Sequence, residues 1–556
     1  MANDPQMEDR KPPKVDNSLT VEALDRLEDA RRQKAMMDLD LREGYFFTAP
    51  HRSRMVSSRS PLPQWKPQDA IELNTSLGKE VAGDFPTVVL NTFMPQAEPW
   101  VKQKVVTAGL DPKIVKQAEA EAETQAMAIF AAIGASNFYA EFGKGAKPDL
   151  GLGQIATWIK DPGQGEPIQC MSVPLRELEM NLGPDGQVDD RFIVRWTTYR
   201  RIKALVGKSS LPAEIEQKIK DSPKKACCAI WAFWRLYDEA PTEKWQYVLL
   251  IDKTQIESNV LKGDGSCPLV IGRFGATTEW AWASGPTIEA LEELRTIDEL
   301  SAKKIKNVDN SVDPALAWPD DSFVNIEEGI ENGKAYKVRP GTEDAIKNIY
   351  TPNSPEAAIF EAQELEQRVK RLHFLDFPEQ TGKTPPTLGQ WLDEMTRAQQ
   401  RIGTPGLTFW AEYCAGSFKR FRFLLERRGE IKPIVVNGQK VSVMPFNPAQ
   451  RAAEQQEVAQ FAKFMQLAGG AFPEEIKMIT DAEATADNLA ARLGVTKLWA
   501  KRDPAQMQQA IGNIKQLLGG QAPGAPDVPG QPAGGPVNPA GPAPQSPRFD
   551  FRSLKA

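Results

Sequence analysis

The chain has 556 residues, of which 41% are hydrophobic and 26% are charged, and its formal net charge at pH 7 is −6. This composition is typical of folded globular material, with enough chain for about three or four domain-sized units. So small a net charge excludes a basic protein that coats nucleic acid, and no apolar run approaches the ~20 residues of a membrane-spanning helix. The first residues, MANDPQMEDRKPPK, lack the apolar core of a secretory signal, so we expect synthesis in the cytosol.

The chain is poor in the residues that most catalysis and metal binding use. Its only histidines are His51 and His373, which lie far apart in the sequence. The five cysteines show no CxxC spacing and are expected to be buried free thiols: Cys170, Cys227, Cys228, Cys267 and Cys414. We therefore predict no zinc site, no cofactor and no enzymatic activity.

The N-terminal part is predicted to be helical. The stretch SLTVEALDRLEDARRQKAMMDLDL has Ser18 or Thr20 as a plausible N-cap, and its helix is expected to end near Gly44. Its apolar positions recur at helical spacing: Leu24, Leu27, Met36 and Leu39. A second helix is predicted over 111–130, with Pro112 in its first turn.

From Leu150 the apolar pattern becomes that of short strands rich in β-branched and aromatic residues: IATWI, LRELEMN, DRFIVRWTTY, WQYVLLID and CPLVIGRF. GPDGQ predicts a hairpin between LRELEMN and VDDRFIVRW, and Asp264-Gly265 predicts another between IESNVLKG and CPLVIGRF. The block LPAEIEQKIK between them is helical in pattern. The region as a whole is predicted to be one α+β domain.

A glycine-rich motif and two acidic pairs could suggest a cofactor or a metal, but neither ligand is predicted. GLGQIA, Gly151 to Ala156, satisfies the letters of the dinucleotide fingerprint, but KGAKPD precedes it and Pro162 follows too soon for the required helix. We interpret it as a strand that enters the sheet. The acidic pairs Asp189-Asp190 and Asp320-Asp321 carry metal-binding groups, but turns commonly contain such pairs, and no metal is predicted.

Two amphipathic helices follow and bracket a compact segment. In TIEALEELRTIDELSAKKIKNV the apolar residues share one face: Ala290, Leu291, Leu294, Ile297, Ile305 and Val308. The segment after it, up to residue 354, is rich in turns and short strands. The second helix, SPEAAIFEAQELEQRVKRLHFLDF, has Ser354 as N-cap and Pro355 at its first position.

The next segment, FPEQTGKTPPT, ends like a nucleotide-binding P-loop, with Gly382, Lys383 and Thr384. The pattern requires a glycine five residues before Gly382, where this chain has Phe377, and a helix directly after the loop, where it has Pro385-Pro386. We therefore interpret the segment as a polar loop between two helices and not as a phosphate site.

The C-terminal third contains further helices, a hairpin and a tail. LGQWLDEMTRAQQRIG and LTFWAEYCAGSFKRFRFLLERRG are helical in pattern. Asn437-Gly438 within KPIVVNGQKVSVMPF is a strong hairpin signal. Residues 448–518 are predicted to be helical. Residues from Gly519 onward are dominated by Gly, Pro and Ala and are predicted to form a flexible tail.

Four stretches in this order resemble the portal, or head-to-tail connector, protein of short-tailed bacteriophages: LNTFMPQAEPW, IGASNFYAEFGKGAKPDLGLGQIATWI, CPLVIGRFGATTEWAWASGPTIEALEELRTID and TPPTLGQWLDEMTRAQQRIG. The resemblance extends over most of residues 20–450, and the order of these stretches carries it. The chain departs from the family in AWASGPT, where the family has a glycine-rich turn, and in TLGQW, which keeps the family's Thr-x-x-Glu-Val motif only loosely.

The resemblance implies an α+β, helix-rich, portal-like fold. Its implied parts, in chain order, are an N-terminal helix and arm (1–59), a wing (60–285), stem helix 1 (286–308), a clip (309–354), stem helix 2 (355–376), a tunnel loop (377–386), crossing helices with the wing's β-hairpin (387–447), a helical crown (448–518) and the flexible tail (519–556).

The resemblance further implies a structural protein of the virion. It would form a dodecameric ring at the capsid vertex, made in the host cytoplasm and not in a membrane, with double-stranded DNA in its channel. Its other partners would be the terminase packaging motor, capsid and scaffolding proteins, and tail adaptor proteins. The residues that the resemblance places as DNA-channel candidates are Gln380, Thr381, Lys383, Lys303, Lys304, Lys306, Lys370 and Arg371.

Two alternatives remain open from the sequence. One is a nucleotide-dependent enzyme that acts on DNA, and the other is a capsid-associated structural protein without a channel. For Lys383 the alternative to a channel role is a solvated surface lysine. For the helix cations it is an ordinary charged helix face.

Overall fold

The computed structural model of the protein describes residues 17–54, 56–61, 73–96, 99–101, 103–105, 112–206, 211–237, 243–312, 316–317, 347–348, 356–376, 401–403, 405–433, 435–436, 439–440, 443–445, 461, 463–465 and 485. The chain divides into two compact units, Met1–Ala468 and Gly469–Ala556. All elements described below belong to the first unit.

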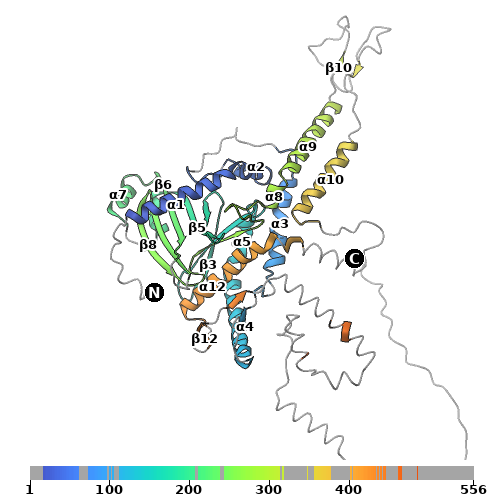
Figure 1. Cartoon of the computed structure of the whole chain (residues 1–556). Coiled ribbons are helices and arrows are strands. Elements are labelled where there is room, and N and C mark those ends of the chain that lie inside the picture. Colours follow the sequence, from blue (N-terminus) through green and yellow to red (C-terminus); the bar gives the residue numbers. More distant parts are fainter. Residues whose placement is uncertain are drawn as a thin grey trace, which may run out of the picture. The chain divides into compact units, whose positions relative to one another are not determined.

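Two antiparallel sheets form the centre of this unit. The smaller has the order β3-β2-β9, with β2 over Gln154–Lys160, β3 over Gln169–Val173 and β9 over Leu269–Arg273. The larger has the order β4-β5-β6-β7-β8, with the bounds Leu178–Leu182, Val188–Thr198, Ala226–Arg235, Lys244–Ile251 and Thr254–Lys262. Helices cover the sheets from outside, so the predicted α+β class is correct (Figure 1).

Alternation along the strands assigns each side chain to one of two cores, because successive residues of a strand point to opposite faces of the sheet. In β6, Ile230 and Trp234 pack on one face, with α1, whereas Trp231 and Phe233 pack on the other, against the three-stranded sheet. The layers are therefore helix, five-stranded sheet, three-stranded sheet and a second set of helices.

The first layer is α1 (Asn17–Met36), which lies across the five-stranded sheet (Figure 1). Ala23, Leu27 and Ala30 are its buried contacts with that sheet. A second helix, α2 (Asp38–Thr48), and a 3₁₀ turn (Pro50–Arg52) follow. The predicted single helix ending near Gly44 is therefore wrong in both respects: it breaks after Met36, and it continues through Gly44, where a Cβ would lie 2.3 Å from Leu152.

The opposite layer consists of α3 (Leu77–Phe93), α4 (Pro112–Ala135), α5 (Phe138–Ala146), a π-helical turn (Trp410–Cys414) and α12 (Ala415–Arg428). These helices enclose the largest aromatic cluster of the unit against the three-stranded sheet. The predicted helix over 111–130 is confirmed as α4, and the GLGQIA segment leads into β2, as expected.

The remaining elements are short or connect the layers. Two helices lie between β5 and β6: α6 (Tyr199–Val206) and α7 (Ala213–Asp221). Two small ladders pair β1 (Gln103–Val105) with β14 (Val443–Pro445) and β12 (Val435–Val436) with β13 (Gln439–Lys440). The second ladder is the hairpin predicted from Asn437-Gly438, and the β4–β5 hairpin predicted from GPDGQ is also confirmed.

The predicted hairpin around Asp264-Gly265 is wrong. β8 pairs with β7 in the large sheet, and β9 pairs with β2 in the small one, so the turn residues carry the chain from one sheet to the other. Gly265 has φ of +76°, and a Cβ there would lie 2.5 Å from the carbonyl oxygen of Lys419. A glycine is thus required because the backbone of α12 passes close to this turn, and not because the turn closes a hairpin. Three strands, β1, β3 and β6, were not predicted.

Candidate functional site at the paired helices

A pair of helices extends from the layered core (Figure 1). After the short α8 (Pro286–Glu289) comes α9 (Leu291–Val312), and its partner is α10 (Glu356–Leu372). The segment between them contains one two-stranded ladder among its described residues, β10 (Leu316–Ala317) with β11 (Lys347–Asn348). The predicted first stem helix, 286–308, thus consists of two helices, and the second of these continues beyond residue 308.

The base of the pair is held by an apolar cluster that α2 and α3 complete. Its buried members are Phe47, Leu77, Val81, Ala290, Leu291, Leu294, Ile297 and Val369. The N-terminal half of α9 therefore packs on the C-terminal half of α10, so the two helices run antiparallel. Burial of this stripe, and not intrinsic propensity, is the main stabilisation of such helices.

The apolar stripe of α9 continues beyond the region that is covered. Leu294 and Ile297 are buried, whereas Ile305 and Val308 are 49% and 54% exposed. On α10 the largest exposed apolar side chain is Phe360, at 70%. The far halves of both helices therefore present apolar groups that the described chain does not bury.

The five helix cations proposed from the sequence are all exposed, but they form two groups. Lys303, Lys304 and Lys306 lie in the far half of α9, whereas Lys370 and Arg371 lie in the last turn of α10, at the base. Lys303 lies 4.0 Å from Glu299 of its own helix, and Arg371 lies 4.0 Å from Asp376. The loop candidates Gln380, Thr381 and Lys383 lie outside the described residues, as does the rest of the P-loop-like segment.

In each helix the acidic side chains come first in the sequence and the basic ones come later. α9 begins with Glu292 and Glu293 in its first turn and carries its lysines in the far half. α10 carries acidic side chains in its far half and basic ones in its last turn. At the base the two distributions meet in an ion pair of 3.7 Å between Arg368 and Glu293.

Below the pair, His373 joins α8 to the C-terminal end of α10 through a buried polar contact. Its Nε2 lies 3.0 Å from Oγ1 of Thr287, and its Nδ1 lies 2.9 Å from the carbonyl oxygen of Val369. The hydroxyl can donate to Nε2 while Nδ1–H donates to the carbonyl, so the neutral ring satisfies both contacts. Burial lowers the pKa of His373 to about 4. No pattern in the sequence singles out this histidine.

The chain that leads into α8 packs tightly on the loop before β2. A Cβ on Gly285 would lie 2.3 Å from the amide nitrogen of Gly153 and 2.4 Å from the carbonyl oxygen of Gly151. The backbone oxygens of Gly151 and Gly153 accept hydrogen bonds from the amides of Thr287 and Phe274. These glycines therefore serve backbone contacts inside the protein, at the start of the segment that enters β2.

A second polar contact joins β9 to the π-helical turn. Arg273 donates to Glu412 from two nitrogens: Nε lies 3.0 and 3.1 Å from its two carboxylate oxygens, and Nη2 lies 2.5 Å from Oε1. It also reaches the carbonyl oxygens of Trp280 and Gly186. The side chain of Arg273 is only 4% exposed. A planar guanidinium bound in this two-pronged way fixes the end of β9 from which the chain departs toward α8.

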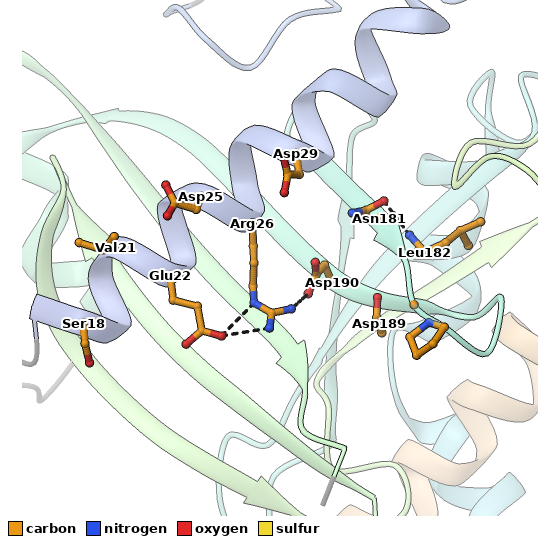
Figure 2. A pocket seen from close by; sticks show the side chains of 12 residues that line it. Ser18, Val21, Glu22, Asp25, Arg26, Asp29, Asn181, Leu182, Asp189 and Asp190 are labelled. Atoms are coloured by element: carbon orange, nitrogen blue, oxygen red, sulfur yellow. Dashed lines mark hydrogen bonds and ion pairs between the residues drawn. The ribbon is translucent and has the colours of Figure 1, made fainter.

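The structure also shows a solvent-open pocket of about 940 Å³ beneath α1, far from the paired helices in sequence (Figure 2). Five of its lining residues are acidic: Glu22, Asp25, Asp29, Asp189 and Asp190. Arg26 neutralises part of this charge, because it binds Asp190 at 3.0 Å and Glu22 of its own helix. Burial raises the pKa of Asp190 to about 6.

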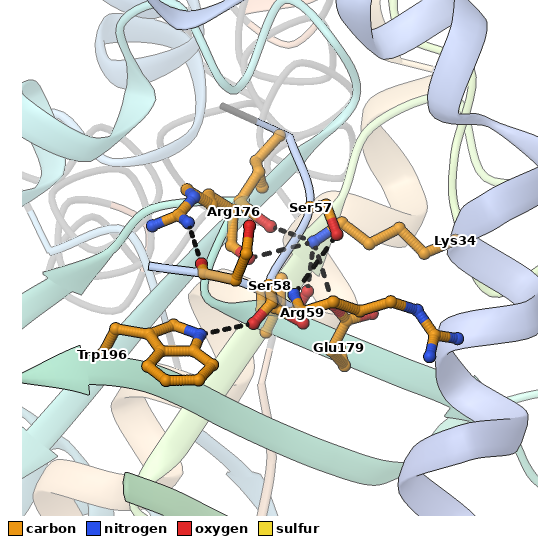
Figure 3. Close-up of polar contacts among 10 residues, drawn as sticks. Lys34, Ser57, Ser58, Arg59, Arg176, Glu179 and Trp196 are labelled. Carbon is orange, nitrogen blue, oxygen red and sulfur yellow. Dashed lines mark hydrogen bonds and ion pairs between the residues drawn. The ribbon is translucent and has the colours of Figure 1, made fainter. Parts of the chain in front are cut away.

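Another buried cation, Lys34, has a structural role. Its Nζ donates to the carbonyl oxygens of Leu175, Arg176 and Leu178, at 2.6, 3.2 and 2.8 Å, and lies 3.3 Å from Glu179 (Figure 3). These partners satisfy the ammonium group and attach α1 to the start of β4. Such full pairing explains how a lysine is tolerated in the interior.

The described residues hold no cluster of three or more His, Cys, Asp or Glu side chains suited to a metal ion. Asp320-Asp321 lies outside the described residues. All five cysteines are free, and burial raises the pKa of the Cys170 thiol to about 12, so that it is no ready nucleophile. Among the described helices, none is both long and apolar enough to span a membrane.

Comparison with known families identifies the chain. The family described as "Bacteriophage head to tail connecting protein" matches residues 21–498. The chain belongs to this family. The prediction of a head-to-tail connector is therefore correct, and this family is structural in kind. No curated protein matches the chain.

One solved structure similar to the chain is described as "Virion of native gene transfer agent (GTA) particle". It is 12% identical and aligns over 86% of this chain and 100% of that chain, with a TM-score of 0.28. So low a TM-score supports no conclusion about this chain.

Proposed function

We propose that the protein is the portal of a bacteriophage-like virion: a ring at one capsid vertex through which double-stranded DNA is packaged and later ejected. Membership of the connector family is the observation that carries this proposal. The ring is proposed to contain twelve subunits, with capsid and scaffolding proteins around it, the terminase motor docked during packaging and tail adaptor proteins afterwards.

In this proposal the layered core is the wing, and α9 and α10 are the stem that surrounds the channel. Support comes from the way the pair is built: its base is held on the core by the apolar cluster with α2 and α3 and by the contact of His373 with Thr287, while the far half of α9 carries exposed cations. Cations spread over a stem give sequence-independent contacts with phosphates, and a small number per subunit does not arrest sliding DNA.

The remaining assignments follow the same proposal. The clip, predicted over 309–354, begins only after Val312, where α9 ends, and motor and tail proteins bind to it in turn. Residues 377–386 form the tunnel loop, in which Lys383, Gln380 and Thr381 approach the DNA. Residues 448–518 form the crown, and 519–556 form a tail without a folded core. The protein itself hydrolyses no nucleotide, since Phe377 replaces the glycine that a P-loop requires.

Negative-stain imaging of the purified full chain tests the central proposal. We expect rings with a central hole. Particles without a hole, at every concentration tested, would instead favour a capsid-associated protein without a channel. Robust ATP hydrolysis that Lys383→Ala abolishes would favour the nucleotide-dependent enzyme.

The channel assignment has a more direct test. A photoreactive group at position 383 in filled particles should crosslink to DNA, and the same group at exposed position 203 of α6 should not. A probe at 383 that labels only protein on the outer surface contradicts the assignment of the loop to the channel.

A further inference from the structure

The pocket beneath α1 carries more negative charge than its own residues balance. Its lining contains five acidic side chains and one cation, Arg26. Arg26 binds two of the acids, Glu22 of its own helix and Asp190 of β5 (Figure 2). Asp29 lies 3.0 Å from Arg32, but both side chains are exposed, so water screens this pair. The lining therefore keeps an excess of negative charge.

Asp189 lies in this pocket because the β4–β5 ladder is irregular. The register shifts after Asn181, which pairs with Asp190, so that Asp189 is an extra residue without a Cα partner in β4. Neighbouring residues of a regular strand point to opposite faces, but a bulge redirects the side chain, and both aspartates line the pocket (Figure 2). The irregularity thus gathers two carboxylates beneath α1.

Asp189 also lacks a partner that a buried carboxylate requires. It is 6% exposed, and its Oδ2 accepts a hydrogen bond from the hydroxyl of Tyr237 at 3.2 Å. Its Oδ1 is buried and has no hydrogen-bond partner among the described residues. A buried carboxylate oxygen costs free energy unless a donor binds it, so the pocket is suited to a cationic group.

The acidic side chains are spread along the pocket and do not converge on one point. On α1, Glu22, Asp25 and Asp29 recur at three- and four-residue spacing, so they share one face over ~10 Å. The described residues hold no group of three acids suited to a metal ion. Apolar side chains also line the pocket, among them Val21, which is 57% exposed, and Leu182. Such a lining fits an extended segment that carries several cations and apolar groups between them.

The segment just before α1 has a matching composition. Residues 10–14, RKPPK, hold three cations and no acidic residue, and they lie outside the described residues. Proline favours an extended backbone and adds apolar surface that Val21 can cover. The segment therefore offers both kinds of group that the pocket requires.

The segment is also long enough to reach the acidic side chains. If the chain turns back at Asn17, where α1 begins, an extension of ~3.3 Å per residue carries Lys14 ~10 Å and Arg10 ~23 Å along the helix. At ~1.5 Å per residue, Glu22 lies ~8 Å and Asp29 ~18 Å from the same point. The cations thus reach the whole line of carboxylates on α1.

We propose that the pocket binds residues 10–14 of the same chain, which run back along α1 and place their three cations against the carboxylates of the pocket. One of these cations supplies the donor that Oδ1 of Asp189 lacks, and the two prolines cover Val21. The contact does not depend on the proposed ring, because it needs one chain only.

Limited trypsin digestion of the purified full chain tests the contact, because trypsin cuts after Arg10 and Lys14 and a bound segment is protected. Asp25→Asn with Asp29→Asn removes two exposed carboxylates of the pocket. We expect cleavage on the order of 10-fold faster in this variant, since proteolysis follows the population of the released segment. Asp189→Asn should change the rate in the same direction.

The matched control for the digestion removes two acidic charges elsewhere. Glu121→Gln with Glu123→Gln changes exposed positions of α4, in the opposite layer, and should leave the cleavage rate at residues 10 and 14 unchanged. Pocket variants that unfold at the original temperature and are cut at the original rate overturn the proposal. Equal acceleration in the α4 control also overturns it, because the effect would then come from net charge and not from the pocket.

A disulfide shows whether the occupant belongs to the same chain. Lys11→Cys with Asp29→Cys in one chain should form a bond between these two positions on mild oxidation, identified by mass spectrometry of the linked peptides. Lys11→Cys with Glu123→Cys should not form one. A bond that appears only in a mixture of the two single variants, between chains, assigns the pocket to a second copy and overturns the proposal. Absence of the bond in both experiments overturns it as well.

Discussion

The layered core and the far halves of the paired helices differ in where their charged and apolar side chains lie. In the core, Lys34 and Arg273 are buried, and each is bound by several oxygens of its own chain. Beyond Ile297 of α9, apolar side chains are exposed, and charged ones lie in water. The core therefore buries its apolar side chains and pairs its buried charges within one chain. The far halves of the helices expose such groups and are suited to contacts with another molecule.

The largest effect is expected where the core holds a buried charge. Glu412→Ala removes the carboxylate that binds Arg273, and the guanidinium stays buried with only two carbonyl oxygens. Loss of one partner of a buried pair costs about 3–5 kcal/mol, because the remaining charge is left without compensation. Urea unfolding of the purified protein measures the change in free energy of unfolding.

The matched control is an ion pair on the helices. Lys303 and Glu299 are 75% and 74% exposed, so Glu299→Gln should change the free energy of unfolding by less than about 0.5 kcal/mol. Equal effects of Glu412→Ala and Glu299→Gln would remove the proposed contrast between the core and the helices.

A second effect concerns pH at the base of the helices. His373 has a lowered pKa when folded, about 4, so the unfolded chain binds its proton more readily between pH 6.5 and pH 4. Stability is therefore lost as pH falls through this window, by up to about 3 kcal/mol, and this contribution is constant below pH 4. Thermal or urea unfolding at a series of pH values should show the slope.

His373→Asn is the variant that isolates this slope, because the amide keeps a donor near Val369 but does not titrate. We expect a lower stability at pH 7 and a flatter dependence between pH 6.5 and pH 4. An unchanged slope in His373→Asn would contradict the assignment of this pH dependence to the buried ring.

A third effect compares two glycines of the core. Gly153 has φ of +111°, and a Cβ there would lie 2.7 Å from the carbonyl oxygen of Ala283, so Gly153→Ala should destabilise by about 2 kcal/mol. Gly143 lies inside α5, and the place that a Cβ would take there is open, so Gly143→Ala should stabilise by about 0.5–1 kcal/mol. Opposite signs in thermal unfolding are the expected result, and two changes of the same sign would contradict it.

The sequence predicted those elements whose signal is local. α4 follows from its apolar period and Pro112, and the β12–β13 hairpin follows from Asn437-Gly438, because each needs only neighbouring residues. The family could also be recognised from the order of four stretches. The prediction of a hairpin at Asp264-Gly265 was wrong, because a turn signal does not show whether the next strand joins the same sheet or another.

The site was less accessible to sequence reasoning, because its important contacts join distant residues. Thr287 and His373 are 86 residues apart, and Arg273 and Glu412 are 139 apart. Neither pair has a sequence pattern that marks it. One feature of α10 is visible in the sequence, since Phe360 interrupts an otherwise polar face at helical spacing.

The smallest effect on stability is expected for three exposed cations among the channel candidates on the helices. Lys304, Lys370 and Arg371 are exposed, so replacing all three by Gln should change the free energy of unfolding by less than about 0.5 kcal/mol per residue. If they meet phosphates, each lost contact should reduce the slope of log K against log salt for double-stranded DNA by up to about 0.9. Binding of assembled particles to a DNA duplex over a range of salt concentrations measures that slope.

Lys203→Gln with Lys220→Gln is the control, because these lysines are equally exposed but lie on α6 and α7, and it should leave the slope unchanged. Equal slopes for both sets would mean that the helix cations are an ordinary charged surface, and the channel would then have to take its phosphate contacts from elsewhere in the chain.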